Sequence, residues 1–515
     1  MATVALGSKA GKWIMVSSIM ASAMAFIDST ALNVILPSLQ KSLNASGTDL
    51  FWILNAYLLM LAALILMGGS LGDRLGRKKV FMVGIFIFIL GSAACGFAPG
   101  VTLLIVFRMM QGIGGALMIP GSLSLISSSI NPKERGKAIG TWSAFTTVVT
   151  MGGPVLGGTF GDAGLWRYIF FINIPIGIIA LIILAKNVNE IKDDNSKQGL
   201  DFAGAIAIAL GLAAVTFGFL RIPAVGLHNW QVYTSLGGGL MLLIAFVFIE
   251  KKSKYPMMPL QLFANLTFSG ANLLTFFLYA GLGAGMLFLG LNMVQVQGYS
   301  QLQSGLTFLP FTVLMITIAR FAGALADKHG PRLLLIGGPA AAGAGLLILS
   351  FVKQTAGPSD YWTTFFPGIL VFGLGMSFTV APLTAAVMGS VSDHFSGAAS
   401  GVNNALTRIA NVFANAILGA LAVLFFSGAL QGQLKNGKLN DKQRRVIEQQ
   451  SVNLGNAKVP YGFEVKDKAA IEKAYKNSFI AAYGNIMRIA AGLGFLGALM
   501  AVLFIRNSAV KKGTE

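Results

Sequence analysis

The chain of 515 residues is 55% hydrophobic and 11% charged, whereas soluble domains carry about 25% charged residues, so an ordinary soluble protein is excluded. The formal net charge of +19 would suit a nucleic-acid partner, but most Lys and Arg residues lie in short gaps between long apolar runs. Membrane topology explains this placement, so we expect the lipid bilayer and no nucleic acid as a partner.

The apolar runs are predicted to form membrane-spanning helices, because a helix needs about 20 apolar residues to cross the hydrocarbon. They are continuous in apolarity, whereas membrane strands alternate with period two. The first run is too long for the core of a signal peptide, so we expect it to remain as the first span. These features predict an all-α polytopic membrane protein with fourteen spans, near residues 13–36, 51–71, 80–98, 101–125, 136–160, 166–185, 200–221, 231–250, 267–295, 304–326, 332–352, 361–385, 398–426 and 477–505.

Lys and Arg residues concentrate in alternate short loops, which the positive-inside rule places in the cytoplasm. Basic residues also precede the first span and follow the last, so both termini are expected in the cytoplasm. The connection 428–476 is rich in Lys and Arg yet falls on the outer face, because long loops largely escape the rule. The basic loops contain Arg74, Arg77, Lys78 and Lys79; Lys133, Arg135 and Lys137; Lys251, Lys252 and Lys254; and Lys328 and Arg332.

Two segments of the chain repeat each other. Gly69–Lys78 closes the second span and Gly323–Arg332 closes the tenth, and both carry glycine, acid, base, glycine and base at identical spacing. Such a repeat predicts two six-helix halves built alike. The expected units are an N-terminal six-helix bundle at 12–190, an inserted transmembrane hairpin at 200–250, and a C-terminal six-helix bundle at 260–505 with a long extracellular loop at 428–476.

The repeated motif predicts a tight cytoplasmic turn, in which glycine allows close backbone approach and an acid stands at a helix boundary. A carboxylate there is able to pair with a nearby Arg or with the N-terminus of a neighbouring helix, and so to act as a latch that biases one of two transporter states. The alternative is that the basic residues only set the topology. The candidate latch residues are Gly69, Asp73, Arg74, Gly76, Arg77, Asp327 and Arg332.

Two ionisable residues inside predicted spans are candidates for function, because a charge in the hydrocarbon is costly. Asp28 is the one clear acid within a first-half span, and a buried carboxyl group is a candidate for proton exchange. A structural hydrogen bond is the alternative for this residue. Arg108 cannot usefully lose its proton, so its expected task is to tune a neighbouring acid or to hold an anionic group. The alternative for Arg108 is a side chain that snorkels to the interface.

Other predicted spans contain weaker candidates for functional residues. Gly153 and Pro154 permit a bend and a close helix contact in mid-span, and Gly157 and Gly158 extend a smooth face that would limit leakage between the two halves. Polar side chains that would line a substrate cavity are weaker candidates, and Arg408 is included because it stands beside two asparagines in the thirteenth span. The cavity candidates are Asn33, Gln111, Asn403, Asn404 and Arg408.

Four motifs resemble those of the fourteen-span drug:proton antiporter family within the major facilitator superfamily. Asp28–Pro37, Arg108–Gly114, Gly153–Gly158 and Trp166–Pro175 are similar to its first-span, fourth-span, antiporter and following segments, although Val149 stands where the family usually has glycine. The resemblance implies the major facilitator fold and a bacterial cytoplasmic membrane. It also implies export of small lipophilic or amphiphilic molecules by alternating access, of the multidrug-efflux type, with the proton as coupling ion and roles for Asp28 and Arg108 in coupling.

Other functions remain as alternatives or are excluded. A lipid or amphiphile translocase, or a proton symporter, would use the same scaffold. Some drug exporters of the resembling family carry carboxylates in the later spans, whereas this chain has Asn403 and Asn404 in the thirteenth span and no acid there. This departure weakens the case for multivalent cationic drugs as cargo. An enzyme is not expected, because no acidic pair or Walker-type phosphate loop appears and the histidines lie in separate predicted loops. We expect a monomer with no metal and no cofactor other than the proton. The histidines are His228, His329 and His394, and the single cysteine is Cys95.

Overall fold

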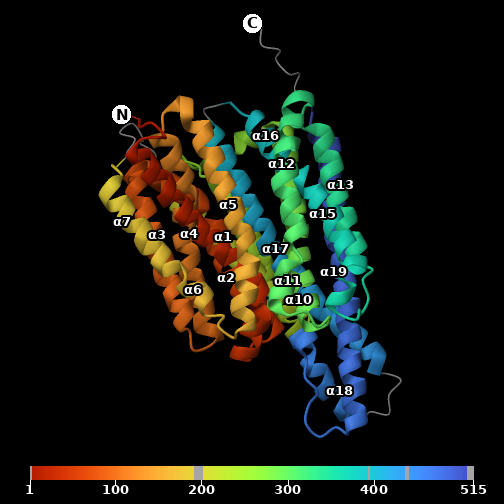
Figure 1. The fold of residues 1–515 in the computed structure, drawn as a ribbon. Coiled ribbons are helices and arrows are strands. Elements are labelled where there is room, and N and C mark those ends of the chain that lie inside the picture. Colours follow the sequence, from red (N-terminus) through yellow and green to blue (C-terminus); the bar gives the residue numbers. More distant parts are fainter. Residues whose placement is uncertain (1–2, 191–200, 393–394, 435–439, 507–515) are drawn as a thin grey trace. The chain divides into compact units, whose positions relative to one another are not determined.

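A computed structural model describes residues 3–190, 201–392, 395–434 and 440–506 of the chain (Figure 1). Within these ranges the chain consists of α-helices joined by short turns and 3-10 segments. The only β-type pairing in the described ranges is an isolated parallel bridge between Val4 and Ile130. The predicted all-α class is therefore confirmed.

The helices follow the predicted apolar runs in chain order. The first part of the chain contains α1 (Lys9–Leu43), α2 (Gly47–Leu75), α3 (Arg77–Phe97), α4 (Val101–Ser129), α5 (Pro132–Asp162), α6 (Tyr168–Phe171), α7 (Asn173–Asn187), α8 (Phe202–Val225) and α9 (Trp230–Lys252). The second part contains η1 (Leu260–Ala264), α10 (Leu266–Gln295), α11 (Gln301–Leu306), α12 (Leu309–His329), α13 (Arg332–Leu349), η2 (Pro358–Asp360), α14 (Tyr361–Thr364), α15 (Phe366–Ser377), α16 (Val380–Gly389), α17 (Ser396–Leu434), α18 (Asp441–Glu448), η4 (Gln449–Asn456) and α19 (Val465–Phe504).

One of the fourteen predicted membrane spans is not confirmed by the structure. Thirteen helical segments of the described ranges are long and apolar enough to cross a membrane. Helices occupy all fourteen predicted runs, but α5 is not among the thirteen. Its 31 residues are long enough, at about 1.5 Å per residue, to cross the hydrocarbon. A total of fourteen spans therefore stays a prediction.

The connection predicted as a long loop, 428–476, is largely helical where it is described. Helix α17 continues to Leu434 and α19 already begins at Val465, with α18 and η4 between them. The ring of Tyr475 stacks on that of Phe426, with centroids 6.3 Å apart, and its hydroxyl donates to the carbonyl oxygen of Ile447 at 3.2 Å. These contacts hold α17, α18 and α19 together. The prediction missed the extensions because their polar residues end the apolar signal while still favouring helix.

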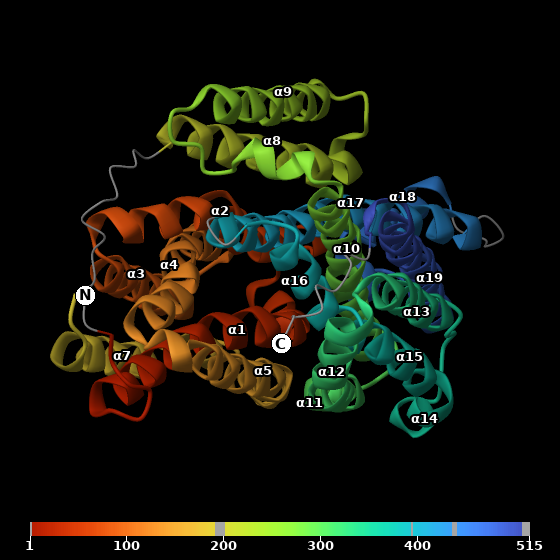
Figure 2. The same cartoon turned by 90° about the horizontal axis from the view of Figure 1, so that it is seen from above.

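The chain divides into two compact units. The first comprises Met1–Leu39, Trp52–Val215 and Gly237–Leu260. In this unit α3 packs against α4, α6 and α7, and α4 packs against α5. Figure 2 shows these helices from above, with α3 and α4 side by side. The candidate coupling residues lie on these helices and on α1.

The second unit comprises Gln40–Phe51, Thr216–Leu236 and Gln261–Glu515. Helix α10 packs against α16, α17 and α19, and α13 packs against α15 and α19. Short polar caps begin several of its helices: the side chain of Asn265 accepts from two amides at the start of α10, and Ser300 forms a capping box with Gln303 at α11. Such caps satisfy amides that have no partner within the helix.

Candidate functional site

The two residues predicted to couple protons form a buried ion pair in the first unit. Asp28 lies in α1 and is fully buried, and Arg108 in α4 is only 1% exposed. The Nη1 of Arg108 donates to Oδ2 of Asp28 at 2.5 Å. Gln111, one turn further along α4, donates from Nε2 to Oδ1 of Asp28 at 2.9 Å and accepts from Nη1 of Arg108 at 2.7 Å. The three side chains therefore close a ring of hydrogen bonds around the carboxylate.

The Arg108 guanidinium also contacts a backbone carbonyl and two aromatic rings. Its Nε donates to the backbone carbonyl of Ile53 at 3.4 Å, and its Cζ lies 4.5 Å from the centre of the Tyr57 ring and 5.9 Å from that of Phe170. An aromatic face stabilises a desolvated cation. Arg108 thus points into the bundle, and the snorkelling alternative does not describe its conformation.

A second layer of polar side chains supports Gln111. Its Nε2 lies 3.3 Å from Oγ of Ser92 on α3, and Ser92 also accepts from Nδ2 of Asn173 on α7 at 3.0 Å. The Ser92 hydroxyl donates to the carbonyl of Phe170 at 2.8 Å. All of these side chains are buried, so the network joins α1, α3, α4 and α7 away from bulk water.

The structure shows which of these residues the sequence signals missed. Asp28 and Arg108 stand out because charges are rare in apolar runs, and Asn173 belongs to a recognised motif but carried no assigned role. Gln111, predicted to line the substrate cavity, forms hydrogen bonds with Asp28 and Arg108. Ser92 and Tyr57 carry no distinguishing signal, since Ser and Tyr are ordinary residues in spans. Asn33, the other cavity candidate of the first half, is half-buried on α1, and no hydrogen bond links it to this network in the described residues.

The antiporter motif on α5 packs directly against α1 beside Asp28. A Cβ at Gly153 would lie on top of Oγ1 of Thr30, and a Cβ at Gly157 would lie 2.6 Å from the carbonyl oxygen of Ala31. The Thr30 hydroxyl also reaches the carbonyl of Thr150 on α5 at 3.1 Å. The close approach that these glycines permit is thus with α1, within the same unit. The predicted sealing face between the two halves stays a prediction, as do the roles of Pro154 and Gly158.

Two adjacent glycines of α5 provide a matched test of this packing. We expect Gly153→Ala to lower the free energy of unfolding by about 1–3 kcal/mol, because the new methyl group has to push α1 and α5 apart. Gly152→Ala adds the same methyl group where nothing lies within 4 Å, so it should be neutral or slightly stabilising. Melting of the two purified variants in detergent checks this difference. Equal melting temperatures would contradict the close α1–α5 contact.

The two copies of the repeated motif form the tight turns that were predicted. Gly76 and Gly330 both adopt positive φ angles, 110° and 83°, which a side chain would disfavour. The Glu190 carboxylate lies against Gly76 and accepts from the amides of Lys78 and Lys79, each at 3.0 Å, so it satisfies the N-terminus of α3.

The other latch candidates give a mixed picture. Arg77 donates to the carbonyl of Ser124 at 3.3 Å, and Arg332 donates to that of Val502 at 3.2 Å. Arg74 is exposed, and a Cβ at Gly69 would meet open space. The side chains of Asp73 and Asp327 lie outside the described part of the structure. A latch that switches between two states therefore stays a prediction.

The polar candidates of the second half form a cluster of their own in the second unit. Asn403 on α17 donates to Oδ1 of Asn272 at 3.1 Å and to Oγ1 of Thr275 at 2.8 Å, both on α10. Asn404 is exposed and bonds to Ser400 of its own helix. Arg408 is half-buried, and its buried Nε has no hydrogen-bond partner among the described residues. The substrate cavity predicted around these residues stays a prediction.

The family of the chain follows from its similarity to a known family model. The model of the Major Facilitator Superfamily matches residues 19–415, a range that includes Asp28, Arg108, Gly153 and Arg408. The chain belongs to the Major Facilitator Superfamily. It is therefore a multi-pass membrane transporter, since members of this superfamily move solutes and are not enzymes.

Curated relatives are named for drug resistance and export. The chain is 29% identical over 440 residues to the multidrug resistance protein Stp of Mycobacterium tuberculosis, which covers 85% of this chain and 81% of Stp. It is 26% identical over 490 residues to the tetracenomycin C resistance and export protein of Streptomyces glaucescens, covering 94% and 90% of the two chains. It is 30% identical over 417 residues to the multidrug transporter MdtP of Bacillus subtilis, covering 80% and 74%.

Solved structures share the fold at low sequence identity. A bacterial homologue of the human lysosomal transporter Spinster, in an inward-facing conformation, matches with a TM-score of 0.65 and 18% identity, covering 98% of this chain and all of that one. The xylose transporter XylE of E. coli in an inward-open conformation matches with a TM-score of 0.57 and 14% identity, covering 97% of each chain. These matches confirm the predicted major facilitator fold.

Proposed function

We propose that this transporter exports small lipophilic or amphiphilic molecules across the cytoplasmic membrane in exchange for protons, by alternating access. The names of its relatives support drug efflux, and the observation that carries proton coupling is the buried ring formed by Asp28, Arg108 and Gln111. Burying a carboxylate in a transmembrane helix costs free energy, so a residue of this kind usually has a function. Proton exchange during the transport cycle is the function that we assign to Asp28.

The geometry suggests how the cycle would proceed. In the described conformation Asp28 is fully buried and ion-paired, so a proton reaches it only after the network opens. Arg108 keeps its charge throughout and competes with the proton for the carboxylate. When Asp28 takes a proton from the outer side, its bond to Arg108 weakens and α1 is free to move relative to α4. Release of the proton on the inner side restores the ion pair.

We also propose that both termini of the transporter lie in the cytoplasm and that it is a monomer. Aromatic and Met side chains are plentiful, with 37 Phe and 21 Met, and such side chains adapt to apolar cargo of varied shape. No ATP-binding loop was found, so an ion gradient is the proposed source of energy.

Transport in proteoliposomes with an imposed pH gradient tests this proposal. The purified full chain is reconstituted, and a panel of lipophilic compounds is followed with and without the gradient. We expect cargo to move against the direction of proton flow, and the effect to vanish when an ionophore collapses the gradient. Cargo moving with the protons would favour the symport alternative, and movement of a fluorescent phospholipid would favour the translocase alternative. If the flux of every compound ignores the gradient, proton coupling is refuted.

A further inference from the structure

Two acidic side chains that are distant in sequence meet at one end of the inserted hairpin. Asp201 precedes α8 and is 7% exposed, and Glu250 near the end of α9 is 3% exposed. Each carboxylate has one oxygen in a local hydrogen bond: Oδ1 of Asp201 accepts from the amide of Gly204 at 2.8 Å, and Oε2 of Glu250 accepts from the amide of Met258 at 2.9 Å. Among the described residues, Oδ2 of Asp201 and Oε1 of Glu250 have no hydrogen-bond partner.

These two free oxygens converge on the same small space. A Cβ at Gly204 would lie 3.0 Å from Oδ2 of Asp201 and 3.1 Å from Oε1 of Glu250, so the two oxygens lie within about 6 Å of each other. Buried acceptors without a donor are rare in folded proteins. Two of them at one point, beside a residue without a side chain, form a site for a compact group that donates hydrogen bonds and carries positive charge.

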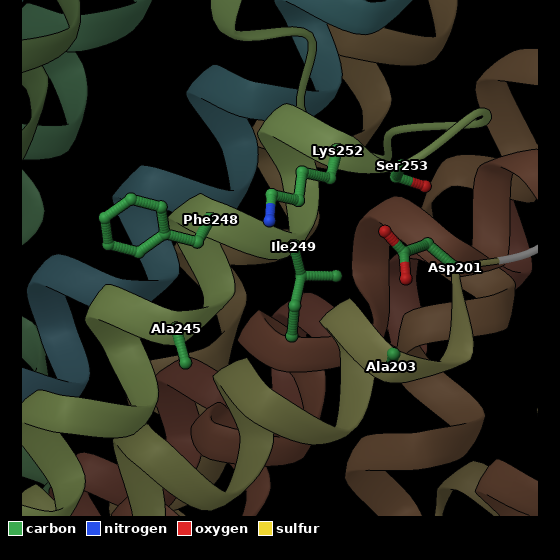
Figure 3. A pocket seen from close by; sticks show the side chains of 7 residues that line it. All are labelled: Asp201, Ala203, Ala245, Phe248, Ile249, Lys252 and Ser253. Atoms are coloured by element: carbon green, nitrogen blue, oxygen red, sulfur yellow. The ribbon is translucent and has the colours of Figure 1, made fainter.

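Asp201 also lines a groove on the hairpin that has apolar and charged walls. Figure 3 shows Asp201 and the Ser253 hydroxyl at one end, and the Lys252 side chain extended toward Phe248. The groove has a volume of about 600 Å³, and its other lining residues are Ala203, Ala245 and Ile249. The Lys252 ammonium points toward Phe248 and away from Asp201 (Figure 3). The groove therefore presents an anionic end, a separate cation and an apolar wall.

We propose that this groove binds a phospholipid with a primary ammonium headgroup, such as phosphatidylethanolamine. The ammonium donates to Oδ2 of Asp201 and Oε1 of Glu250, the phosphate faces Lys252, and the apolar part of the lipid lies on Phe248. A primary ammonium has three N–H donors, as the Lys ammonium does. A quaternary choline group has none, and an anionic glycerol headgroup would face two carboxylates. The site is separate from the Asp28 network and does not depend on the proposed transport cycle.

A metal ion fits this place less well. Calcium takes six to eight oxygen ligands and magnesium demands near-octahedral geometry. The described residues contain no group of three or more His, Cys, Asp or Glu side chains arranged around one point. Two carboxylate oxygens next to an apolar groove match an amphiphile with an ammonium group better than a bare cation.

The headgroup series on the unaltered protein is the primary test. Full-length protein in detergent is titrated with phosphatidylethanolamine, its mono- and dimethylated forms, phosphatidylcholine and phosphatidylglycerol, with binding followed by native mass spectrometry. We expect affinity to fall as N–H donors are replaced by methyl groups, with phosphatidylethanolamine bound about tenfold more tightly than phosphatidylcholine. Equal binding of these two lipids would overturn the proposal, and is the result expected if the two carboxyls only share a proton.

Variants of the site give an independent check with a matched control. Gly204→Ala places a methyl group where the ammonium is expected, and Asp201→Asn combined with Glu250→Gln removes both charges; each should abolish the preference for phosphatidylethanolamine. Gly238→Ala on α9 adds the same methyl group where nothing lies within 4 Å, and should keep the preference. If the preference survives in Gly204→Ala and in the double variant, the site is wrong. Should the double variant not fold, the headgroup series and the glycine pair still decide.

Discussion

Replacing Asp28 by Asn is expected to abolish accumulation of cargo against its gradient in proteoliposomes with an imposed pH difference. A pH difference of one unit corresponds to about 1.4 kcal/mol per proton. Exchange of one proton for one neutral cargo molecule therefore supports about a tenfold concentration ratio per pH unit. An amide at position 28 cannot take up or release a proton near neutral pH, so the variant should reach a ratio near one. The measurement is the steady-state cargo ratio at several pH differences.

Two further variants make this result specific. Asp28→Glu keeps the carboxyl group and should retain part of the gradient dependence. Asp441→Asn removes an exposed acid at the start of α18 and should behave as the unaltered protein. If Asp28→Asn accumulates cargo as the unaltered chain does, the acid at position 28 is not the coupling group. The transporter assignment would survive that result, because it rests on the family and not on this residue.

Much of the fold was predictable because the bilayer imposes a simple rule on the chain. Continuous apolar runs of about 20 residues have few alternatives to membrane-spanning helix. The paired motifs that end at Lys78 and Arg332 likewise predicted two matching turns, and the positive φ angles of Gly76 and Gly330 confirm them. The rule does not predict helices that consist of polar residues. The first turns of α5 are polar, and α17 and α19 continue as helices beyond their apolar segments.

The candidate site was predictable only one residue at a time. Asp28 and Arg108 were visible because each breaks an apolar run, but the bond between them joins positions 80 residues apart. Such a pairing depends on how helices pack, which one sequence does not reveal. The same limit explains Asp201 and Glu250, since no acidic pair was apparent until α8 and α9 were folded against each other. Hydroxyl and amide side chains such as Ser92 carry still less signal, because they are common in spans.

The second large effect is expected in a double-mutant cycle on the buried ion pair. Arg108→Gln should lower the free energy of unfolding by about 3–5 kcal/mol, because the Asp28 carboxylate is left buried without its counter-charge. Asp28→Asn should lower it by a similar amount, since Arg108 then keeps a buried charge with only dipoles and rings around it. Unfolding in mixed detergent micelles measures both values. The control is Arg221→Gln, an exposed arginine, whose effect should stay within about 0.5 kcal/mol.

The combined Asp28→Asn, Arg108→Gln variant separates stability from coupling. It removes both charges, and the two new amides are able to bond to Gln111, so it should be more stable than either single variant. Additive losses in the double variant would show that the two side chains do not act as a pair. The same variant should remain unable to use a pH gradient, because no titratable group is left at the centre of the ring. If the double variant is stable but cannot use a pH gradient, the two charges are needed for transport and not for folding.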